Sequence, residues 1–512
     1  MEVNLRKLFK ALAILTSFSI LTRALGFLFR IILSRAIGAE GLGIYQISFS
    51  VFMVLETFIS SGLPLVVSKY TSKSIAENNT LKQKSVITSA LLIGLITAML
   101  LCIIVILFKN FFGLLFTDKR CLNILIVLLP GLVFSSVYAI LRGNLWGQKK
   151  YFLVSFTEFL EQLFRMLIFV FLMAIFYSIF DGIVIASISY VISCAMSALI
   201  VLIVYLKNKG KFEKPKKDLC VSLLKTSIPI TSVRVVSSLL MPIISIIIPI
   251  QLIKCGYTNE QALSIFGVAM GMTFPLLYIP STLVGSLSVT LIPDLSTAIA
   301  QENFLEIKTK VNFAIKFGMF VAFLFVPIFY ALGETIGIFL YNNIQSGVFL
   351  SNSCLLILPI CLSGLTVSCL NALNLEVKGF INYAIGALFL FLSIILLTKF
   401  IGILSLVWGM GLCLGIASIL NIRLLNKKLK YKFFNLMYLT KLFICSIPAI
   451  LICRWCFNIL NIFSPLIISL SISCLAGEIF FLMFGLIFNL YNLSFLKTKK
   501  SKKFLNLSHK NG

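Results

Sequence analysis

The chain has 512 residues, of which 60% are hydrophobic and 12% charged, and its mean hydropathy is +1.07. A soluble protein of this length exposes much more polar surface, so the composition excludes a soluble globular fold and predicts a membrane protein. The 44 Lys and Arg residues exceed the 17 Asp and Glu residues, but they lie in short loops between apolar segments. This placement favours contact with anionic lipid headgroups over nucleic-acid binding.

A bilayer-spanning helix needs about 20 consecutive apolar residues, and fourteen segments of the chain meet this requirement. The first follows Arg6, Lys7 and Lys10 but lacks a cleavage site, so we expect a helix and not a removed signal peptide. The predicted fold is an all-α polytopic membrane protein with fourteen transmembrane helices. The predicted helices cover residues 10–34, 44–67, 86–108, 122–142, 152–177, 183–206, 226–252, 262–292, 312–333, 353–375, 381–400, 402–424, 439–460 and 465–490.

Basic residues are concentrated in alternate loops, which predicts that both termini lie in the cytoplasm. The longest basic loop, 207–225, follows the sixth predicted helix and indicates a cytoplasmic linker between two six-helix lobes. Segments 68–85 and 207–225 are then inside, and segments 35–43, 109–121 and 253–261 are outside. We therefore expect an N-lobe at 1–206, a C-lobe at 226–424, an extra helix pair within 425–490 and a basic cytoplasmic tail at 491–512.

Three arginines within predicted helices are the first candidates for a binding site, because a charge at membrane depth costs about 2.5–3.5 kcal/mol. Arg23 and Arg30 are seven residues apart on the first helix, about two turns, so both point the same way. Arg234 lies on the seventh helix. Three guanidinium groups that face one cavity would suit a diphosphate, which they bind in bidentate fashion. The alternative for Arg30 is that it snorkels to the outer interface.

Two further helices carry charged candidates for a substrate cavity. Glu56, near the middle of the second helix, is either the counter-ion of Arg23 or a proton-coupling carboxylate. On the fifth helix Glu161 precedes Arg165 by four residues, the favourable direction for an intrahelical ion pair, and Glu158 shares that face. A structural salt bridge between helices and a cavity-lining role both remain open for this group.

Prolines mark candidate hinges in the predicted helices. A proline removes a backbone donor, frees a carbonyl and bends a helix, which suits a lobe that moves. We expect the hinge positions to be Pro64, Pro242, Pro249, Pro275 and Pro280.

Several kinds of chemistry are excluded by what the sequence lacks. The only histidine, His509, lies in the basic tail, which removes Ser-His and Cys-His nucleophilic sites and histidine metal clusters. Cys453 and Cys456 form a C-x-x-C pair without further ligands, so we expect them to pack as small apolar residues. No Walker lysine motif appears, so ATP does not power transport on this chain. We expect neither an enzyme nor a bound cofactor or metal; the expected energy source is a coupling ion, Na⁺ or H⁺, or the membrane potential.

The segments LTRALGFLFRIILSRAIGAEGLGIYQ, SGLPLVVSKYTSK and FGVAMGMTFPLLYIPSTLVGSLSVTLIPDLSTAIA closely resemble the stage V sporulation protein B family. That family belongs to the multidrug/oligosaccharidyl-lipid/polysaccharide (MOP) exporter superfamily, alongside lipid II flippases, and the resemblance covers nearly the whole chain. It implies a two-lobe bundle that alternates between inward-facing and outward-facing states. It also implies a cationic central cavity for a polyprenyl-diphosphate sugar, with a groove for the lipid tail at the last two helices.

The resemblance also carries over individual residues. In lipid II flippases an essential arginine of the first helix matches Arg23, and an arginine on the seventh or eighth helix matches Arg234. Their second arginine on the first helix falls at Phe29, one position before Arg30. An arginine on their second helix has no counterpart near Glu56.

The resemblance predicts a flippase for lipid II, acting in spore cortex or cell-wall synthesis, with a lipid-linked oligosaccharide as substrate and cell-wall polymerases as protein partners. One alternative is a flippase for another undecaprenyl-linked unit. A second is a cation-coupled drug exporter, a class that usually has twelve helices and an acidic cavity. A third is a non-transport scaffold for cell-wall polymerases.

Overall fold

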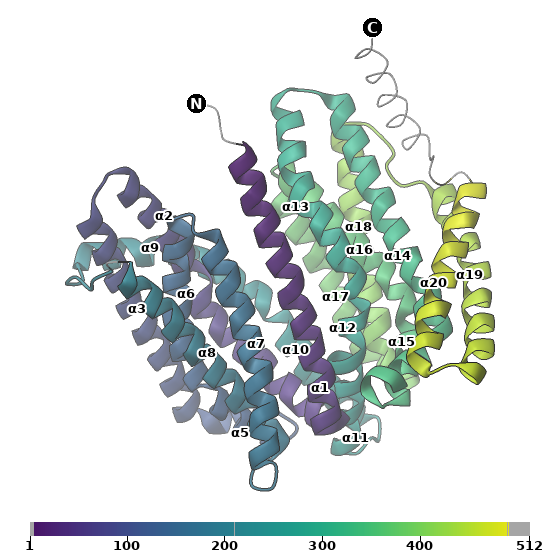
Figure 1. Cartoon of the computed structure of the whole chain (residues 1–512), viewed down its shortest axis with the longest axis horizontal. Helices are drawn as coiled ribbons and strands as arrows, with labels where there is room; N and C mark the ends of the chain where they lie inside the picture. The colour runs from purple at the N-terminus through teal and green to yellow at the C-terminus, as the bar shows by residue number, and fades with distance from the viewer. Residues whose placement is uncertain (1–4, 209, 489, 491–512) are drawn as a thin grey trace, which may run out of the picture. The chain divides into compact units, whose positions relative to one another are not determined.

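The computed structural model describes residues 5–208, 210–488 and 490, and these ranges contain helices and no strand. The predicted all-α class is therefore confirmed. The basic tail predicted at 491–512 lies outside the described residues. Figure 1 colours the helices by their position along the chain.

Nearly all of the described residues belong to helices that are joined by short turns. The bounds are α1 (Leu5–Ser60), α2 (Gly62–Ala76), α3 (Thr80–Leu107), α4 (Lys109–Leu115), α5 (Lys119–Leu128), α6 (Pro130–Gly147), α7 (Tyr151–Phe176), α8 (Gly182–Lys207), α9 (Lys217–Ser238), α10 (Leu240–Lys254), α11 (Asn259–Phe266), the π-helix η1 (Gly267–Thr273), α12 (Phe274–Leu277), α13 (Ile279–Ala300), α14 (Phe304–Tyr341), α15 (Ile344–Ser353), the 3-10 helix η2 (Cys354–Leu356), α16 (Ile357–Ala372), α17 (Glu376–Ile401), α18 (Leu404–Leu429), α19 (Leu436–Phe463) and α20 (Leu466–Ile487).

Twelve helical stretches in the described ranges are long and apolar enough to cross a membrane, or thirteen if α5 and α6, which are bent by 41°, count as one span. The chain is thus a multi-pass membrane protein. The stretch Ser17–Ala76 has 60 residues, or about 90 Å of helix, roughly three times the thickness of a bilayer's hydrocarbon core. It contains the first two predicted helices, so the expected number of fourteen spans stays a prediction.

Within the connection predicted at 35–43, α1 consists of two helices that meet at a kink, where Gly38 has a non-helical backbone (φ 71°, ψ −176°); that this connection lies outside stays a prediction. Glycine adopts a positive φ without steric cost, so the kink needs no intervening loop. Beyond the kink, α1 packs backbone to backbone against α11 and η1. A Cβ on Gly43 would collide with the Leu263 carbonyl, and a Cβ on Gly267 with the Ala39 carbonyl. Only glycine allows the two helices to approach this closely.

The chain divides into two compact units, Met1–Met272 with Thr398–Ile403, and Thr273–Leu397 with Leu404–Gly512. The division therefore falls at Met272, within η1, and not at the basic segment 207–225. The reason is that α9, which follows the basic segment, packs against α1, α2 and α3 of the first unit. The expected lobes 1–206 and 226–424 stay a prediction about how the protein moves.

The basic segment 207–225 is itself docked on the first unit. The backbone N–H of Glu213 donates to Thr88 Oγ1 at 3.2 Å, and the hydroxyls of Tyr70 and Ser222 lie 2.6 Å apart. Leu223 is fully buried in a cluster formed with α2, α3, α6 and α8. These contacts tie the segment to the ends of α2 and α3.

In the second unit, α19 and α20 form the predicted extra helix pair and pack against α14, as the yellow hairpin of Figure 1 illustrates. Leu332 of α14, Cys453 of α19 and Leu470 of α20 meet in one buried cluster. The Cys453 thiol lies 3.4 Å from the Ser473 carbonyl, and Gly477 leaves room for it. All 13 cysteines are free, and Cys453 acts as the small packing residue that we expected.

Four of the five predicted hinge prolines stand in the first turn of a helix: Pro64 in α2, Pro242 in α10, Pro275 in α12 and Pro280 in α13. The first-turn N–H groups have no partner within the helix, so proline costs nothing there. Pro249 lies inside α10. These prolines therefore mark breaks between helices, and their role as hinges stays a prediction.

Candidate functional site

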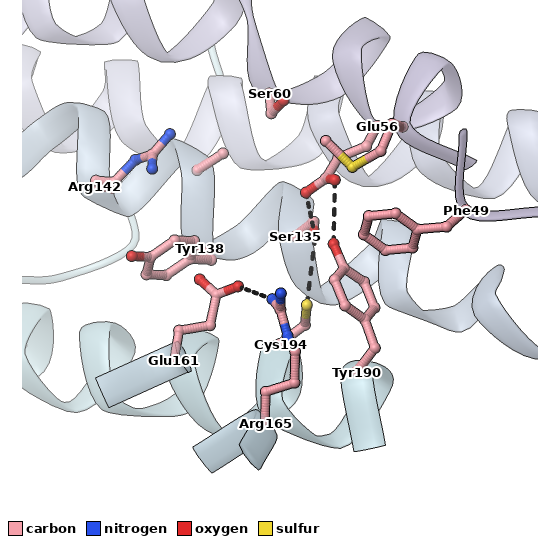
Figure 2. A pocket seen from close by; sticks show the side chains of 12 residues that line it. Phe49, Glu56, Ser60, Ser135, Tyr138, Arg142, Glu161, Arg165, Tyr190 and Cys194 are labelled. Atoms are coloured by element: carbon pink, nitrogen blue, oxygen red, sulfur yellow. Dashed lines mark hydrogen bonds and ion pairs between the residues drawn. The ribbon is translucent and has the colours of Figure 1, made fainter. Parts of the chain in front are cut away.

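A polar cavity of about 330 Å³ lies within the first unit, among α1, α6, α7 and α8 (Figure 2). Polar groups in a membrane bundle gather where helices face one another, because the surrounding lipid offers them no partner. Glu56, Glu161 and Arg165 were predicted as site residues, and all three line this cavity. The full lining is Phe49, Met53, Glu56, Ser60, Ser135, Tyr138, Ala139, Arg142, Glu161, Arg165, Tyr190 and Cys194.

Glu56 enters the cavity from the last two turns of α1. Its carboxylate accepts hydrogen bonds from Ser135 Oγ of α6 at 3.0 Å and from Tyr190 Oη of α8 at 3.1 Å. Among the described residues Glu56 has no ion pair, so the structure does not support its expected pairing with Arg23. Two hydroxyls, and no cation, hold this carboxylate in place.

Arg165 and Glu161 form the predicted ion pair within α7, with Arg165 Nη2 2.7 Å from Glu161 Oε1. The Arg165 guanidinium also lies over the Tyr190 ring, 4.4 Å from its centroid. Cation–π contact and a carboxylate together stabilise a charge that would otherwise be costly at membrane depth. Because Tyr190 in turn binds Glu56, the three charged residues form one connected set (Figure 2).

Arg142 is a cavity residue that the sequence did not single out, because it lies at the end of a predicted helix among loop cations. Its guanidinium pairs with Glu158 of α7 at 3.0 Å and lies over the rings of Tyr138 and Trp146, at 5.3 and 4.9 Å. The aromatic residues stand four positions before and after Arg142 on α6. This spacing places all three on one helix face and could have indicated the contact.

The cavity offers both donors and acceptors to a polar occupant. The Nε–H groups of Arg142 and Arg165 are buried and have no hydrogen-bond partner in the described part of the chain. Buried donors of this kind are rare and mark a space that is polar. No group of three His, Cys, Asp or Glu residues in the described ranges could hold a metal ion. The arrangement suits proton binding or hydrogen bonding to a polar ligand.

The remaining predicted arginines lie outside this cavity. Arg23 on α1 and Arg234 on α9 are exposed, and neither has an ion pair among the residues that the structure describes. Arg30 is half-buried, and together with Arg165 it acts electrostatically on Tyr45. The structure thus brings the two glutamates and Arg165 together and leaves Arg23, Arg30 and Arg234 outside this cavity.

A second, largely apolar cavity of about 420 Å³ lies among α1, α2, α3 and α9 of the first unit. From α9 it is lined by successive helical turns at Ser227, Thr231 and Val235, together with Ile228 and Val236. Val235 and Val236 directly follow Arg234 in sequence. Arg234 itself does not line the cavity.

A charged cluster outside the apolar spans joins α1, α5 and α11. Asp118 caps α5 and accepts hydrogen bonds from the Arg120 backbone at 2.7 Å, from the Arg120 guanidinium at 2.9 Å and from the Asn259 amide at 3.2 Å. Arg120 also pairs with Glu40 of α1. Burial alone would raise the pKa of the Asp118 carboxyl, but Arg120 and Asn259 outweigh this effect and hold the pKa below its usual range.

Comparison with known proteins agrees with the fold. Residues 8–293 match the family model of the polysaccharide biosynthesis proteins. The chain is 25% identical to stage V sporulation protein B of Bacillus subtilis (strain 168) over 394 residues, which cover 74% of this chain and 75% of the relative. It is 24% identical to sporulation protein YkvU of the same organism over 305 residues, covering 58% of this chain and 66% of that protein.

Two solved structures share the architecture. The inward closed conformation of the lipid II flippase MurJ matches with a TM-score of 0.69 and 18% identity, over 93% of this chain and 98% of that one. An inward-facing multidrug resistance MATE family transporter of the MOP superfamily matches with a TM-score of 0.64 and 16% identity, over 80% of this chain and 95% of that one. These relatives are transporters and not enzymes. The chain belongs to the polysaccharide biosynthesis protein family and has the fold of the MOP exporter superfamily.

Proposed function

We propose that this protein is a flippase that moves undecaprenyl-diphosphate-linked peptidoglycan precursor, lipid II, across the bacterial cytoplasmic membrane by alternating access. The observation that carries the proposal is the pair of exposed arginines within membrane-spanning helices, Arg23 and Arg234, which have no carboxylate partner in the described part of the chain. A cation in this position needs an anion, and a guanidinium binds a diphosphate through two parallel hydrogen bonds.

Other features support the same class of substrate. The apolar cavity lined by Val235 and Val236, which follow Arg234 in sequence, would accept the first isoprenoid units of a polyprenyl chain while the diphosphate binds at the arginine. The similarity to stage V sporulation protein B favours a role in spore cortex synthesis. The basic loops favour a cytoplasmic location for both termini.

Complementation tests the proposal in cells. When expressed in a bacterium depleted of its own lipid II flippase, the protein should restore growth and the appearance of lipid II on the outer leaflet. Arg23→Ala and Arg234→Ala variants should insert normally but fail to restore growth, and Lys at either position should restore it only partly, because Lys lacks the planar two-pronged donor.

The same cells separate the alternatives. If another undecaprenyl-linked glycan reaches the surface while lipid II stays inside, the protein is a flippase for a different lipid-linked unit. Resistance to cationic dyes without either lipid product would identify a drug exporter and overturn the proposal.

A further inference from the structure

Glu56 is held in a way that suits a carboxyl group that gains and loses a proton. It faces the polar cavity from a membrane-spanning helix, and its two oxygens are bound by the hydroxyls of Ser135 and Tyr190 at 3.0 and 3.1 Å (Figure 2). Hydroxyl groups can both donate and accept, so they can serve a carboxylate and a protonated carboxylic acid equally. A guanidinium partner would instead fix the charged form.

The other titratable groups that face the cavity come from α6, α7 and α8, and the lining includes none from α2, α3, α5, α9, α10 or α11. They are Tyr138, Arg142, Glu161, Arg165, Tyr190 and Cys194. Arg142 forms an ion pair with Glu158, and Arg165 forms one with Glu161. Each of these two ion pairs carries no net charge, so an ionised Glu56 leaves the group with one uncompensated negative charge. A proton on Glu56 makes the whole group neutral, which is the favoured state at membrane depth.

The same geometry disfavours a sodium ion at this position. A bound cation at Glu56 would contact Tyr190, whose ring already carries the Arg165 guanidinium at 4.4 Å. Two positive charges would then share one aromatic residue in a medium that screens them poorly. A proton adds no separate ion to the cavity and needs no further oxygen ligands.

Glu56 lies on the same helix as Arg23, one of the two arginines that we propose for the diphosphate. The Gly38 kink divides α1 into a half that carries Arg23 and Arg30 and a half that carries Glu56. The half that carries Arg23 packs against α7 beside Glu161, since a Cβ on Gly26 would lie 3.6 Å from the side chain of Gln162.

We propose that Glu56 is a proton-binding site that couples to the binding of the anionic lipid headgroup; this inference rests on the proposed flippase function. Glu56, Arg23 and Arg234 belong to the same compact unit, and a neutral Glu56 removes one negative charge from it, so the protonated protein binds the diphosphate more tightly. By linkage, binding of the diphosphate must then promote proton uptake at Glu56.

Infrared difference spectra of the full-length protein in lipid test the proton site without any substrate. Between about pH 5 and about pH 9 the wild type should show the carbonyl band of a buried carboxylic acid, and Glu56→Gln should remove that band. Glu77→Gln, at an exposed carboxylate between α2 and α3, is the matched control and should retain it. If Glu56→Gln does not fold, Glu56→Asp should keep the band and shift its frequency. A band unchanged in both variants would overturn the proposal.

Equilibrium binding of undecaprenyl diphosphate tests the coupling. The wild-type affinity should weaken by up to about tenfold per pH unit above the midpoint of the titration, whereas Glu56→Gln should keep the low-pH affinity throughout. Glu77→Gln should follow the wild type. Equal pH dependence in Glu56→Gln, or a sodium dependence that this variant abolishes, would refute the coupled proton site. If the infrared band behaves as expected but no lipid diphosphate binds at any pH, the proposed function fails and the proton site stands.

Discussion

Arg165 is the residue on which the contacts of the polar cavity converge. It pairs with Glu161 within α7 and stacks on Tyr190, whose hydroxyl holds Glu56. Both members of the ion pair are largely buried, at 15% and 20% side-chain exposure. Removing one partner of such a pair leaves an uncompensated charge, which costs about 3–5 kcal/mol, whereas replacing both by apolar residues costs much less.

We therefore predict that Arg165→Leu lowers the free energy of unfolding by about 3 kcal/mol and that the Arg165→Leu, Glu161→Leu double variant recovers most of this loss. The measurement is equilibrium unfolding in a fixed mixed micelle. The matched control is Lys310→Ala, which breaks the more exposed i,i+4 pair of Lys310 and Glu306 and should cost less than about 1 kcal/mol. An Arg165→Leu variant no less stable than Lys310→Ala would show that the cavity charges are solvated.

Part of the site could be predicted from the sequence at this scale, namely the part that depends on local spacing. The pair of Glu161 and Arg165 follows from a separation of four residues in a helix. The partners of Glu56 could not be predicted, because Ser135 and Tyr190 lie 79 and 134 residues away and only helix packing brings them together. Arg142 was missed because its depth depends on where α6 ends.

At the scale of elements, the crossing of α1 with α11 and η1 depends on glycine. Gly43 and Gly267 each face a backbone carbonyl of the opposite helix, and a Cβ at either position would collide with it. Gly267→Ala should therefore lower the free energy of unfolding by about 1–3 kcal/mol, the usual cost of overpacking. Gly415→Ala on α18, where a Cβ would meet nothing within 4 Å, is the matched control and should be neutral or stabilising. The measurement is the thermal unfolding midpoint of each variant. Equal midpoints would mean that α1 can move away from α11 and η1 without loss of stability.

The Asp118 cluster predicts a pH dependence of stability. The folded pKa of Asp118 lies below its unfolded value of about 3.9, so its contribution is fully present above that value. It is lost as the pH falls through the lowered folded pKa. Asn can still cap α5 but loses the ion pair with Arg120, so Asp118→Asn should cost about 1 kcal/mol at neutral pH. The variant should also flatten the acid limb of the profile of thermal midpoint against pH. Asp218→Asn, at an exposed carboxylate in the first turn of α9, should leave the profile unchanged. Superimposable profiles for wild type and Asp118→Asn would disprove the role of this cluster.

The positions of most helices could be predicted from apolar length alone, as α3, α7, α8 and α17 to α20 illustrate. The breaks between helices could not. The expected connection at 35–43 is a short kink at Gly38 between two helices, because glycine adopts a positive φ without steric cost. Gly267 and Gly271, four residues apart, both pack closely against α1.

At the scale of the whole molecule, the distribution of basic residues predicts which loops face the cytoplasm. Single cysteines placed at Lys119 or Glu260, both exposed, should react with an impermeant reagent in intact cells once the 13 native cysteines are replaced. Cysteines at Asn78 or Lys214 should react only after the membrane is opened. Labelling of Lys214 from outside would invert the predicted orientation.

The two-unit division shows where prediction from sequence ends at this scale. The basic segment 207–225 indicates a boundary in charge and hydropathy, yet compact packing divides the chain at Met272. The difference arises because α9 and α10 pack against α1, a contact between distant segments that no local pattern encodes.

Movement of a labelled lipid by the purified protein tests the central claim most directly. In proteoliposomes with fluorescent lipid II in both leaflets, an impermeant reductant bleaches the outer leaflet, and an active flippase exposes the inner fraction as well. The account predicts nearly complete bleaching with the wild type. It predicts a rate at least about tenfold lower with Arg23→Ala and Arg234→Ala combined, since each arginine loses its charged hydrogen bonds to the diphosphate. Bleaching that stops at the outer leaflet, as in protein-free liposomes, or an undiminished rate in the double variant, would contradict it.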